Sequence, residues 1–566
     1  SVLESRQGRQ VEDVLKQAIA AHKVGNLEQA EQTYGEILAA EPDNTEALNA
    51  LGILRMQIGS PEIALDCFER AAQLSPGTAK YHNNVGNVRM AQEKFDAALT
   101  AFERAASLTP ENPEFMANAA TACWRAGDSA EAEKLFLKVL TLDPGHYRAN
   151  HNLGALLSQQ HRLGDALPYL EKAARDPDCE VDALLNLATT YERLNRLEEA
   201  TAVVDQIAET EHPRLRFLRA RLLRRKGDAA AALDLLNEAP GGVDFEALGL
   251  EFAAEWCHEL MLCADLEGKY ELAYENLLAV KSYRRRAFGA MGENVFLEEV
   301  RRWRQKGNLA DRPMQKGGDG SAKSEASPAQ VFFVGFPRSG TTLLEVILNS
   351  HPEIVTTDEA EILSTVLRGD EGADAETMRR RYLETFGRLC GEIGSAVTIV
   401  DKLPLNIIYC RAMDQYFPQA RLLMALRDPR DVVLSCLMQR FGFNPAMRNF
   451  DTLESTVTLY EEVMGLCLEA RASLRLPWLE YCYEDLIADR DTVLAGIMEF
   501  IGVQWHGDMD SYRDMAASRQ IVSPSYRDVT EPIYKRAAGR WRAYESNLAP
   551  VLDRLAPFVE AFGYEP

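Results

Sequence analysis

Two arrangements of apolar and polar residues follow one another along the chain. Up to about residue 304 the pattern is helical, and small residues recur within it at a long, regular spacing. Alanines at equivalent places lie 34 residues apart, at Ala30, Ala64, Ala98, Ala132, Ala166 and Ala200. From Val331 onward, short apolar runs alternate with helical segments. The change of pattern predicts two architectures in one multidomain chain.

The N-terminal spacing predicts a stack of helix pairs. Small residues are needed where paired helices approach closely, and a proline at the end of each unit stops its second helix. Turn glycines and unit-ending prolines follow the frame, at Gly25, Gly59, Gly127, Gly227, Pro42, Pro76, Pro110 and Pro144. This pattern is typical of tetratricopeptide repeats. After Ala200 the spacing loosens: the next alanine is Ala232, and a late unit follows at Gly268 and Ala273. We therefore expect an all-α solenoid over residues 10–304, with seven regular repeats, one degenerate repeat and capping helices.

A solenoid of this length offers a concave groove. We expect the groove to bind a protein or peptide, although repeats that only support the adjoining domain would show the same pattern. The basic run from Arg284 to Arg286 would attract an acidic peptide or would be a solvated helix face. Residues 305–328 are rich in Gly, Ser, Ala and charge, which predicts a linker before a domain over residues 329–566.

The C-terminal alternation of strands and helices predicts a parallel sheet flanked by helices. The apolar runs that we assign to strands begin at Val331, Val397, Arg421 and Leu476. Ligands of such sheets bind beyond the carboxyl ends of the strands. A polar candidate ends or follows each run, namely Arg338, Lys402, Arg427 and Tyr483. We expect these four side chains to converge on one edge of the sheet.

A phosphate-binding loop follows the first strand, with the sequence GFPRSGTT from Gly335 to Thr342. Nucleoside-triphosphate loops read G-x-x-x-x-G-K-[ST], and here Thr341 stands where the lysine is expected. That lysine contacts the β- and γ-phosphates, so its absence argues for a nucleotide without a γ-phosphate. Arg338 would supply a forked positive charge to another anionic group. These features together indicate a phosphosulfate ligand.

PRSGTT followed by LRDPRDVVLS resembles the paired signature of the sulfotransferases, whose catalytic domain is a P-loop-type α/β fold. The spacing is most similar to the tyrosylprotein sulfotransferases and to bacterial enzymes in which such a domain follows tetratricopeptide repeats. The likeness covers roughly residues 328–566. It implies 3′-phosphoadenosine 5′-phosphosulfate (PAPS) as sulfuryl donor, adenosine 3′,5′-bisphosphate as product, and no metal.

The resemblance also implies which residues bind the donor. The loop residues are Pro337, Arg338, Ser339, Gly340, Thr341 and Thr342. Arg427 and Ser435 match the positions that hold the 3′-phosphate. Tyr483 matches a position near the adenine. Ser525 and Arg540 match a late loop that closes over the phosphosulfate, with Ser523 as the alternative to Ser525.

Sulfuryl transfer requires a base for the acceptor hydroxyl and a cation for the leaving oxygen. Glu359 lies 21 residues after Arg338, the spacing of the proposed base in tyrosylprotein sulfotransferases, and Arg338 is expected to share the stabilisation of charge. Lys402 occupies the place of the family lysine, although the motif reads DKLP where those enzymes have NKDP. Alternative bases are Asp358, Glu361 and His351. Lys402 would instead be structural if it only paired with Asp401 or Glu359.

The composition of the chain disfavours some classes of binding partner and some cellular compartments. The net charge of −24 and the pI near 5.0 disfavour binding to nucleic acid or to an anionic membrane surface. Ten cysteines are scattered singly, without the spacing of a zinc site or a disulfide framework. The sequence shows no apolar membrane span or signal core. We therefore expect a cytoplasmic protein, unlike the membrane-anchored eukaryotic enzymes that it resembles.

The leading hypothesis is a PAPS-dependent transfer of a sulfuryl group to tyrosine of a protein or peptide presented by the repeats. A carbohydrate or small-molecule hydroxyl is the alternative acceptor. A P-loop kinase would need a lysine at the position of Thr341 and would depend on a metal. A third hypothesis is a repeat scaffold with an inactive, nucleotide-sensing domain. The sequence leaves the oligomeric state open.

Overall fold

The computed structural model describes residues 2–238, 244–289, 292–306, 328–369, 373–391, 398–442, 444–512 and 538–566. The chain folds into two compact units, Ser1–Leu235 and Leu236–Pro566. The first unit is entirely helical in its described part, and the second contains the β-sheet.

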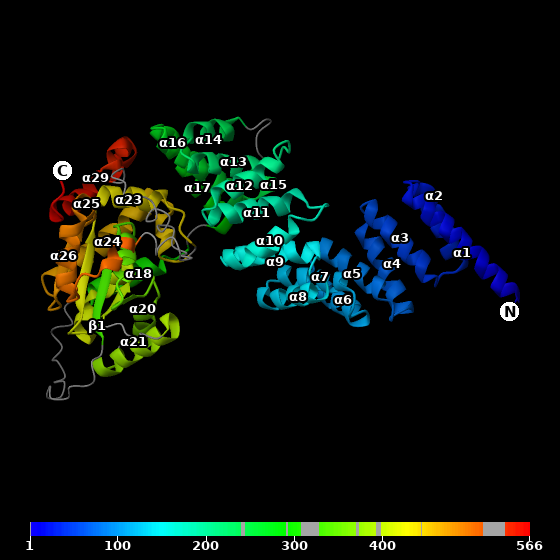
Figure 1. The fold of residues 1–566 in the computed structure, drawn as a ribbon, viewed down its shortest axis with the longest axis horizontal. Helices are drawn as coiled ribbons and strands as arrows, with labels where there is room; N and C mark the ends of the chain where they lie inside the picture. The colour runs from blue at the N-terminus through cyan, green and yellow to red at the C-terminus, as the bar shows by residue number, and fades with distance from the viewer. Residues whose placement is uncertain are drawn as a thin grey trace. The chain divides into compact units, whose positions relative to one another are not determined.

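In the described part of the chain up to Asn237, helices follow one another closely, and consecutive helices from α1 to α12 pack in pairs (Figure 1). They are α1 (Val2–Lys23), α2 (Leu27–Ala40), α3 (Thr45–Gln57), α4 (Pro61–Leu74), α5 (Ala79–Ala91), α6 (Phe95–Leu108), α7 (Pro113–Arg125), α8 (Ser129–Leu142), α9 (Tyr147–Gln159), α10 (Leu163–Ala173), α11 (Val181–Arg193), α12 (Leu197–Gln206), α13 (Pro213–Arg225) and α14 (Ala229–Asn237). The predicted all-α repeat region is confirmed, and the number of seven regular repeats stays a prediction.

The turn inside each pair contains one residue with a positive φ. Glycine is the usual residue for this left-handed conformation. The seven residues are Gly25, Gly59, Glu93, Gly127, His161, Asn195 and Gly227. The alanines of the repeat frame, from Ala30 to Ala232, are fully buried. At Gly86 a Cβ atom would lie 2.5 Å from Cε1 of Phe102, so the helices of this pair approach too closely for a larger residue.

The second unit begins with helices that the sequence pattern places in the repeats. They are α15 (Phe245–Leu248), α16 (Leu250–Leu266), α17 (Tyr270–Phe288) and α18 (Val295–Gln305). The pair α16 and α17 is the expected degenerate repeat, with Gly268 in its turn at φ 70°. Lys281 of α17 is buried and donates a 2.7 Å hydrogen bond to the carbonyl oxygen of Phe450. This helix pair is therefore packed against the sheet-containing part of the chain.

Two arginines of the basic run from Arg284 to Arg286 form contacts within the second unit. Arg284 donates a 2.7 Å hydrogen bond to the carbonyl oxygen of Phe441, and Arg286 forms an ion pair with Glu246. Burial lowers the pKa of Arg284. Two of the three arginines therefore help to hold the second unit together.

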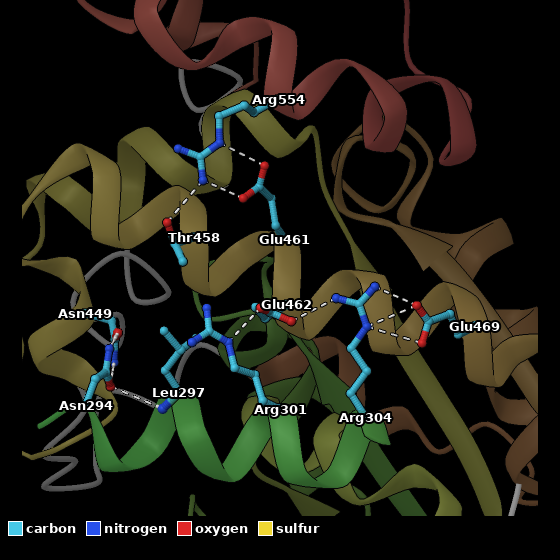
Figure 2. Close-up of polar contacts among 10 residues, drawn as sticks. All are labelled: Asn294, Leu297, Arg301, Arg304, Asn449, Thr458, Glu461, Glu462, Glu469 and Arg554. Carbon is cyan, nitrogen blue, oxygen red and sulfur yellow. Dashed lines mark hydrogen bonds and ion pairs between the residues drawn. The ribbon is translucent and has the colours of Figure 1, made fainter. Parts of the chain in front are cut away.

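Helix α18 packs beside α24 (Leu453–Arg471) through ionic contacts (Figure 2). Arg301 and Arg304 both reach Glu462, each at 2.8 Å, and Arg304 also reaches Glu469 at 2.6 Å. At the start of α18 the Asn294 side chain donates a 2.5 Å hydrogen bond to that of Asn449. The predicted linker follows this helix, and its residues 307–327 lie outside the described part of the chain.

A parallel sheet with the strand order β2-β3-β1-β4-β5 forms the centre of the second unit. Its strands are β1 (Ala329–Gly335), β2 (Ile354–Thr356), β3 (Thr398–Lys402), β4 (Arg421–Leu426) and β5 (Trp478–Cys482). The four predicted strands are confirmed, while β2 was not predicted. In β1, Phe332 and Val334 belong to one hydrophobic core and Val331 and Phe333 to another, as expected for a strand covered on both faces.

Helices cover both faces of the sheet (Figure 1). The remaining described helices, including short 3₁₀ segments η, are α19 (Thr341–Asn349), α20 (Ile362–Gly369), α21 (Ala375–Cys390), η2 (Pro404–Tyr409), α22 (Cys410–Tyr416), α23 (Pro429–Met438), η3 (Met447–Asp451), α25 (Tyr483–Ala488), α26 (Arg490–Ile501), η4 (Gly507–Ser511), η6 (Arg540–Tyr544) and α29 (Glu545–Ala561). Four adjacent parallel strands, β3, β1, β4 and β5, end at the same edge of the sheet. The candidate residues lie at this edge.

Candidate active site

The loop between β1 and α19 has the conformation of an anion-binding turn. Arg338 and Gly340 have φ values of 71° and 88°, so the chain turns sharply between strand and helix. Ser339, Thr341 and Thr342 are buried at the N-terminus of α19. The first backbone N–H groups of a helix have no partner within the helix, and they carry the positive end of its dipole. The loop therefore offers donors and partial positive charge to an anion.

The two motifs of the sequence signature contact each other directly. Nε of Arg338 donates a 3.0 Å hydrogen bond to Oγ of Ser435 in α23. Nη1 of Arg427, which follows β4, donates a 3.0 Å hydrogen bond to the carbonyl oxygen of Arg338. The thiol of Cys436 donates to the carbonyl oxygen of Pro337 at 3.3 Å. Residues about 90 to 100 positions apart in sequence thus form one cluster with two guanidinium groups.

Tyr483 closes one side of this cluster. The guanidinium of Arg427 lies 5.1 Å from the centre of the Tyr483 ring, within the range of a cation–π contact. A Cβ atom on Gly340 would lie 3.1 Å from Cγ and Cε2 of the same ring, and closer still to Cδ2. Glycine is therefore required at position 340 both by its φ value and by the approach of Tyr483.

Asp431 lies in α23 and links that helix to the segment of the chain that begins at residue 538. Its carboxylate accepts hydrogen bonds from the backbone N–H groups of Gly539 at 2.6 Å and Trp541 at 2.8 Å. Burial raises the pKa of Asp431, and the charge of Arg427 opposes that rise. The residues just after position 537 are therefore fixed next to the start of α23.

Arg540, predicted to contact the phosphosulfate, forms an ion pair in this structure. Its Nη2 lies 2.8 Å from Oδ2 of Asp265 in α16, and its Nε donates to Oδ1 of the same carboxylate at 3.2 Å. Tyr544 donates a 2.6 Å hydrogen bond to Asp265 as well. The predicted donor-binding role of Arg540 stays a prediction. Ser525 and its alternative Ser523 lie outside the described residues.

Lys402, the last residue of β3, lies between two carboxylates. Its Nζ is 2.7 Å from Oε1 of Glu359 and 2.7 Å from Oε2 of Glu345. The side chains of Lys402 and Glu345 are 0% and 6% exposed, whereas that of Glu359 is 41% exposed. Burial lowers the pKa of Lys402, but the two negative charges outweigh it and the resulting pKa is raised. Lys402 is therefore held as an ammonium ion.

Glu359 is presented by a short, unusual loop. Asp358 and Glu359 have φ values of 43° and 64°, a conformation that residues other than glycine rarely adopt. The backbone N–H of Glu359 donates to the carbonyl oxygen of Lys402 at 3.1 Å, and the N–H of Lys402 donates to Oγ1 of Thr357 at 3.0 Å. The loop is thus pinned to the end of β3, which holds Glu359 at the edge of the site.

Asp401 faces a different set of partners. Tyr382 donates a 2.7 Å hydrogen bond to its Oδ2, and Thr357 donates to Oδ1 at 3.4 Å. Burial raises the pKa of Asp401 to about 6. The sequence analysis left open a structural pairing of Lys402 with Asp401 or with Glu359, and in the structure Lys402 pairs with Glu359 and also with Glu345.

The alternative bases lie in other settings. Glu361 forms an ion pair with Arg368 at 3.1 Å on the surface. His351 is buried, with Nε2 2.9 Å from the carbonyl oxygen of Gln504 and Nδ1 accepting from the N–H of Glu353. Both ring nitrogens of His351 are therefore used in local structure. Of the carboxylates considered, Glu359 is the one with a direct contact to Lys402.

Glu345 was not recognised from the sequence. It lies in the apolar segment TTLLEVILN, one turn after Thr341 and on the helix that begins at the phosphate loop. A single charged residue in an otherwise apolar helix was the signal that could have marked it. Its partner Lys402 is 57 residues away in sequence, so only the fold reveals the pair.

The side chains at this edge offer hydrogen-bond donors and positive charge to anionic groups. Donors of this kind are the backbone N–H groups at the start of α19 and the hydroxyl groups of Thr341 and Thr342. Arg427 and Ser435, which both contact Arg338, add a guanidinium and a further hydroxyl group. Among the described residues, no group of three or more His, Cys, Asp or Glu side chains has an arrangement that would hold a metal ion.

Both halves of the chain match models of known protein families. Residues 328–507 match the model of the sulfotransferase family. Residues 15–79, 85–147, 157–222 and 213–238 match tetratricopeptide repeat models. The chain therefore carries N-terminal tetratricopeptide repeats and a sulfotransferase-family domain, as the sequence motifs predicted.

Similar proteins include enzymes named for tyrosine sulfation. Protein-tyrosine sulfotransferase 2 of Gallus gallus is 23% identical over 261 residues, which cover 42% of this chain and 69% of that protein. Protein-tyrosine sulfotransferase A of Caenorhabditis elegans is 22% identical, with 42% and 67% covered. An uncharacterised protein of Aquifex aeolicus is 26% identical, with 41% of this chain but only 33% of that protein covered. The chain is thus a distant homologue of the protein-tyrosine sulfotransferases.

Solved structures similar to the chain include a tetratricopeptide repeat protein from Parabacteroides merdae, at 16% identity and a TM-score of 0.36 over 45% of this chain and 99% of that one. Pseudomonas aeruginosa PilF gives 19% identity and a TM-score of 0.33, with 36% of this chain and 92% of that one covered.

Within the described residues, no helix has both the length and the apolar character needed to cross a membrane.

Proposed function

We propose that the protein is a PAPS-dependent sulfotransferase whose acceptor is a tyrosine hydroxyl of a protein or peptide held by the repeats. The observation that carries the proposal is the meeting of the two signature motifs. Arg338 contacts Ser435, and Arg427 contacts the backbone of Arg338, at the edge where Lys402 and Glu359 also lie. This edge of the sheet would thereby combine anion binding with an acid–base pair.

The donor would be held by residues of this chain at two places. The loop from Pro337 to Thr342 would bind the 5′-phosphosulfate, and Arg427 with Ser435 would bind the 3′-phosphate. Tyr483, which lies against both Arg427 and Gly340, would contact the adenine side. When bound, PAPS supplies the sulfuryl group, and the transfer leaves adenosine 3′,5′-bisphosphate.

Glu359 and Lys402 would divide the chemistry between them. Glu359 accepts the acceptor's hydroxyl proton while the acceptor oxygen forms its bond to sulfur. Lys402 donates a hydrogen bond and a positive charge to the bridging oxygen, which takes the electron pair of the breaking S–O bond. Arg338 stabilises the charge on the transferring group. A sulfuryl group carries less negative charge than a phosphoryl group, so these side chains replace the metal that phosphoryl transfer requires.

The acceptor must approach from the exposed side of Glu359. The carboxylate is 41% exposed, while Lys402 behind it is fully buried, so an incoming hydroxyl meets the base first. A phenol has a pKa near 10, which makes it easier to deprotonate than a sugar hydroxyl. The similarity to enzymes named for tyrosine sulfation and the peptide-binding habit of tetratricopeptide repeats support tyrosine.

The donor half of the proposal is tested by calorimetric titration with adenosine 3′,5′-bisphosphate and with magnesium-ATP. We expect the bisphosphate to bind and ATP to bind weakly. Arg427→Ala should weaken bisphosphate binding about 10- to 100-fold, the loss of a charged hydrogen bond of roughly 1.5–3 kcal/mol. The matched control is Arg421→Ala at the other end of β4, where Arg421 bonds the carbonyl oxygen of Ile501 and should leave binding unchanged.

The acceptor half is tested by incubating the full chain with labelled PAPS and two acceptor sets. One set is tyrosine peptides with phenylalanine versions as controls, and the other is oligosaccharides. Label on tyrosine peptides alone supports the proposal, and label on the sugars alone would replace tyrosine with a carbohydrate. Preference for magnesium-ATP, or binding of neither nucleotide, would contradict the sulfotransferase function itself.

A further inference from the structure

Glu345 is a buried carboxylate that the proposed mechanism does not use. It lies on α19, the helix that begins at the phosphate loop, and its Oε2 is 2.7 Å from Nζ of Lys402. Burial raises the pKa of Glu345, and the charge of Lys402 opposes that rise. Asp358 and Glu359 are the other charged groups that act on Glu345. A carboxylate this deeply buried would be costly without a fixed cationic partner.

The three charged groups differ in how they can exchange protons. Glu359 is 41% exposed and can meet an acceptor, whereas Glu345 is 6% exposed and Lys402 is 0% exposed. Lys402 has three ammonium protons, and its Nζ lies 2.7 Å from one carboxylate oxygen of each glutamate. In the proposed reaction the remaining proton goes to the bridging oxygen of the donor.

The charge of the cluster changes when Glu359 takes a proton. With both carboxylates ionised, the cluster of Glu345, Glu359 and Lys402 carries −1 in total, and proton uptake by Glu359 brings it to zero. Without Glu345, the same uptake would leave the buried ammonium of Lys402 with no counter-charge in the cluster. A buried charge without a counter-charge is strongly disfavoured, and Lys402 would then tend to lose its proton.

We propose that Glu345 is a positioning residue that keeps Lys402 charged and oriented while Glu359 alternates between its ionised and protonated forms. Glu345 acts on the reaction only through Lys402 and touches neither the acceptor nor the donor. This inference rests on the proposed sulfotransferase function for its kinetic part. Its electrostatic part, the retention of charge on Lys402, holds independently of the reaction.

The test compares Glu345→Gln with the wild-type full chain. Gln keeps the size of the side chain and removes its charge. With lysine side chains labelled with ¹³C at Cε, the Lys402 signal is identified by its absence in Lys402→Met and is titrated by NMR. We expect a lower pKa for Lys402 in Glu345→Gln. An unchanged Lys402 titration overturns the proposal whatever the activity.

Kinetics provide the second readout, using PAPS and the best acceptor. Glu345→Gln should lower kcat about 10- to 100-fold, as the loss of outer partners does at metal sites, and should leave bisphosphate binding unchanged. The basic limb of the pH profile of kcat should move to lower pH, because Lys402 loses its proton earlier. In a Lys402→Met background, Glu345→Gln should have no further effect on kcat. A merely structural role would lower the melting temperature without moving the pH limb, which would overturn the proposal.

Two variants keep the result interpretable. Glu345→Asp retains the charge and should keep the Lys402 pKa raised, so it decides the matter if Glu345→Gln folds poorly. Glu192→Gln removes another fully buried glutamate, which pairs with Arg225 at 2.6 Å in the repeats, and should leave the Lys402 titration and kcat unchanged. Absence of bisphosphate binding by the wild type would refute the proposed function, while the Lys402 titration would still decide the electrostatic inference.

Discussion

Replacing Gly340 with alanine tests the packing of the phosphate loop. Gly340 has φ 88° and ψ 13°, and a Cβ atom there would meet the ring of Tyr483. The left-handed conformation costs an alanine about 1–2 kcal/mol, of which about 0.4–1 kcal/mol is offset by the lower entropy of the unfolded chain. Moving the ring adds about 1–3 kcal/mol, the usual cost of overpacking. Gly340→Ala should therefore lower the free energy of unfolding by about 2–4 kcal/mol.

Gly502→Ala separates the two costs. Gly502 has nearly the same backbone conformation, with φ 85° and ψ 25°, but a Cβ atom there would lie 3.6 Å from Arg421, an ordinary contact. Its expected cost is about 1 kcal/mol or less, since only the conformational part applies. Urea unfolding of both variants gives the comparison. The difference between them measures the contact with Tyr483.

Binding provides the functional half of the same test. Tyr483 also lies against Arg427, so a displaced ring should disturb the predicted 3′-phosphate site. We expect Gly340→Ala to weaken bisphosphate binding at least about tenfold, a loss of roughly 1.4 kcal/mol, and Gly502→Ala to bind as the wild type does. Equal stability and equal binding of the two variants would refute the close packing of Tyr483 on the loop.

Three further predictions concern catalysis, pH and the repeats. Glu359→Gln should lower kcat about 10²- to 10⁴-fold at unchanged bisphosphate affinity, measured by PAPS turnover and calorimetry, and full activity would exclude Glu359 as the base. Burial gives Asp401 a pKa of about 6 in the folded state, above its ordinary 3.8. The wild type should therefore lose about 2 kcal/mol of stability relative to Asp401→Asn as the pH rises from 4 to 7, and parallel stability curves in urea unfolding would count against this. Gly86→Ala should destabilise the repeats by about 1–3 kcal/mol through its clash with Phe102. Gly35→Ala, in the middle of a helix with nothing within 4 Å, should stabilise them by about 0.4–1 kcal/mol, and thermal unfolding of the pair checks the opposite signs.

Features with a local cause could be predicted from the sequence. The spacing of small residues marked the repeat pairs, because each helix contact requires a small side chain at the same place. It did not mark Glu93, His161 or Asn195 as turn residues, although they take the same positive φ as the glycines. The four long apolar runs predicted four strands, whereas β2 has only three residues and too little pattern to be seen.

Long-range contacts set the limit of prediction at the site. The convergence of Arg338, Arg427 and Lys402 on one edge followed from the rule for parallel strands, and the structure brings Arg338 and Arg427 into contact. Glu345 was missed because its importance depends on Lys402, which only the pairing of β1 and β3 brings near. The pairing of Arg540 with Asp265 joins residues 275 positions apart, and no local pattern carries that information.

The contacts of α16 and α17 with the rest of the second unit affect where two proteins of this kind can be joined in a chimera. Lys281, Arg284 and Asp265 reach from these helices to Phe450, Phe441 and Arg540. A chimera that joins foreign repeats directly before the family-matched segment would remove these contacts and expose buried charge. A junction between α14 and α15 would leave them intact. Helices α16 and α17 thus belong to the same compact unit as the sulfotransferase-family domain, and a chimera should keep them with it.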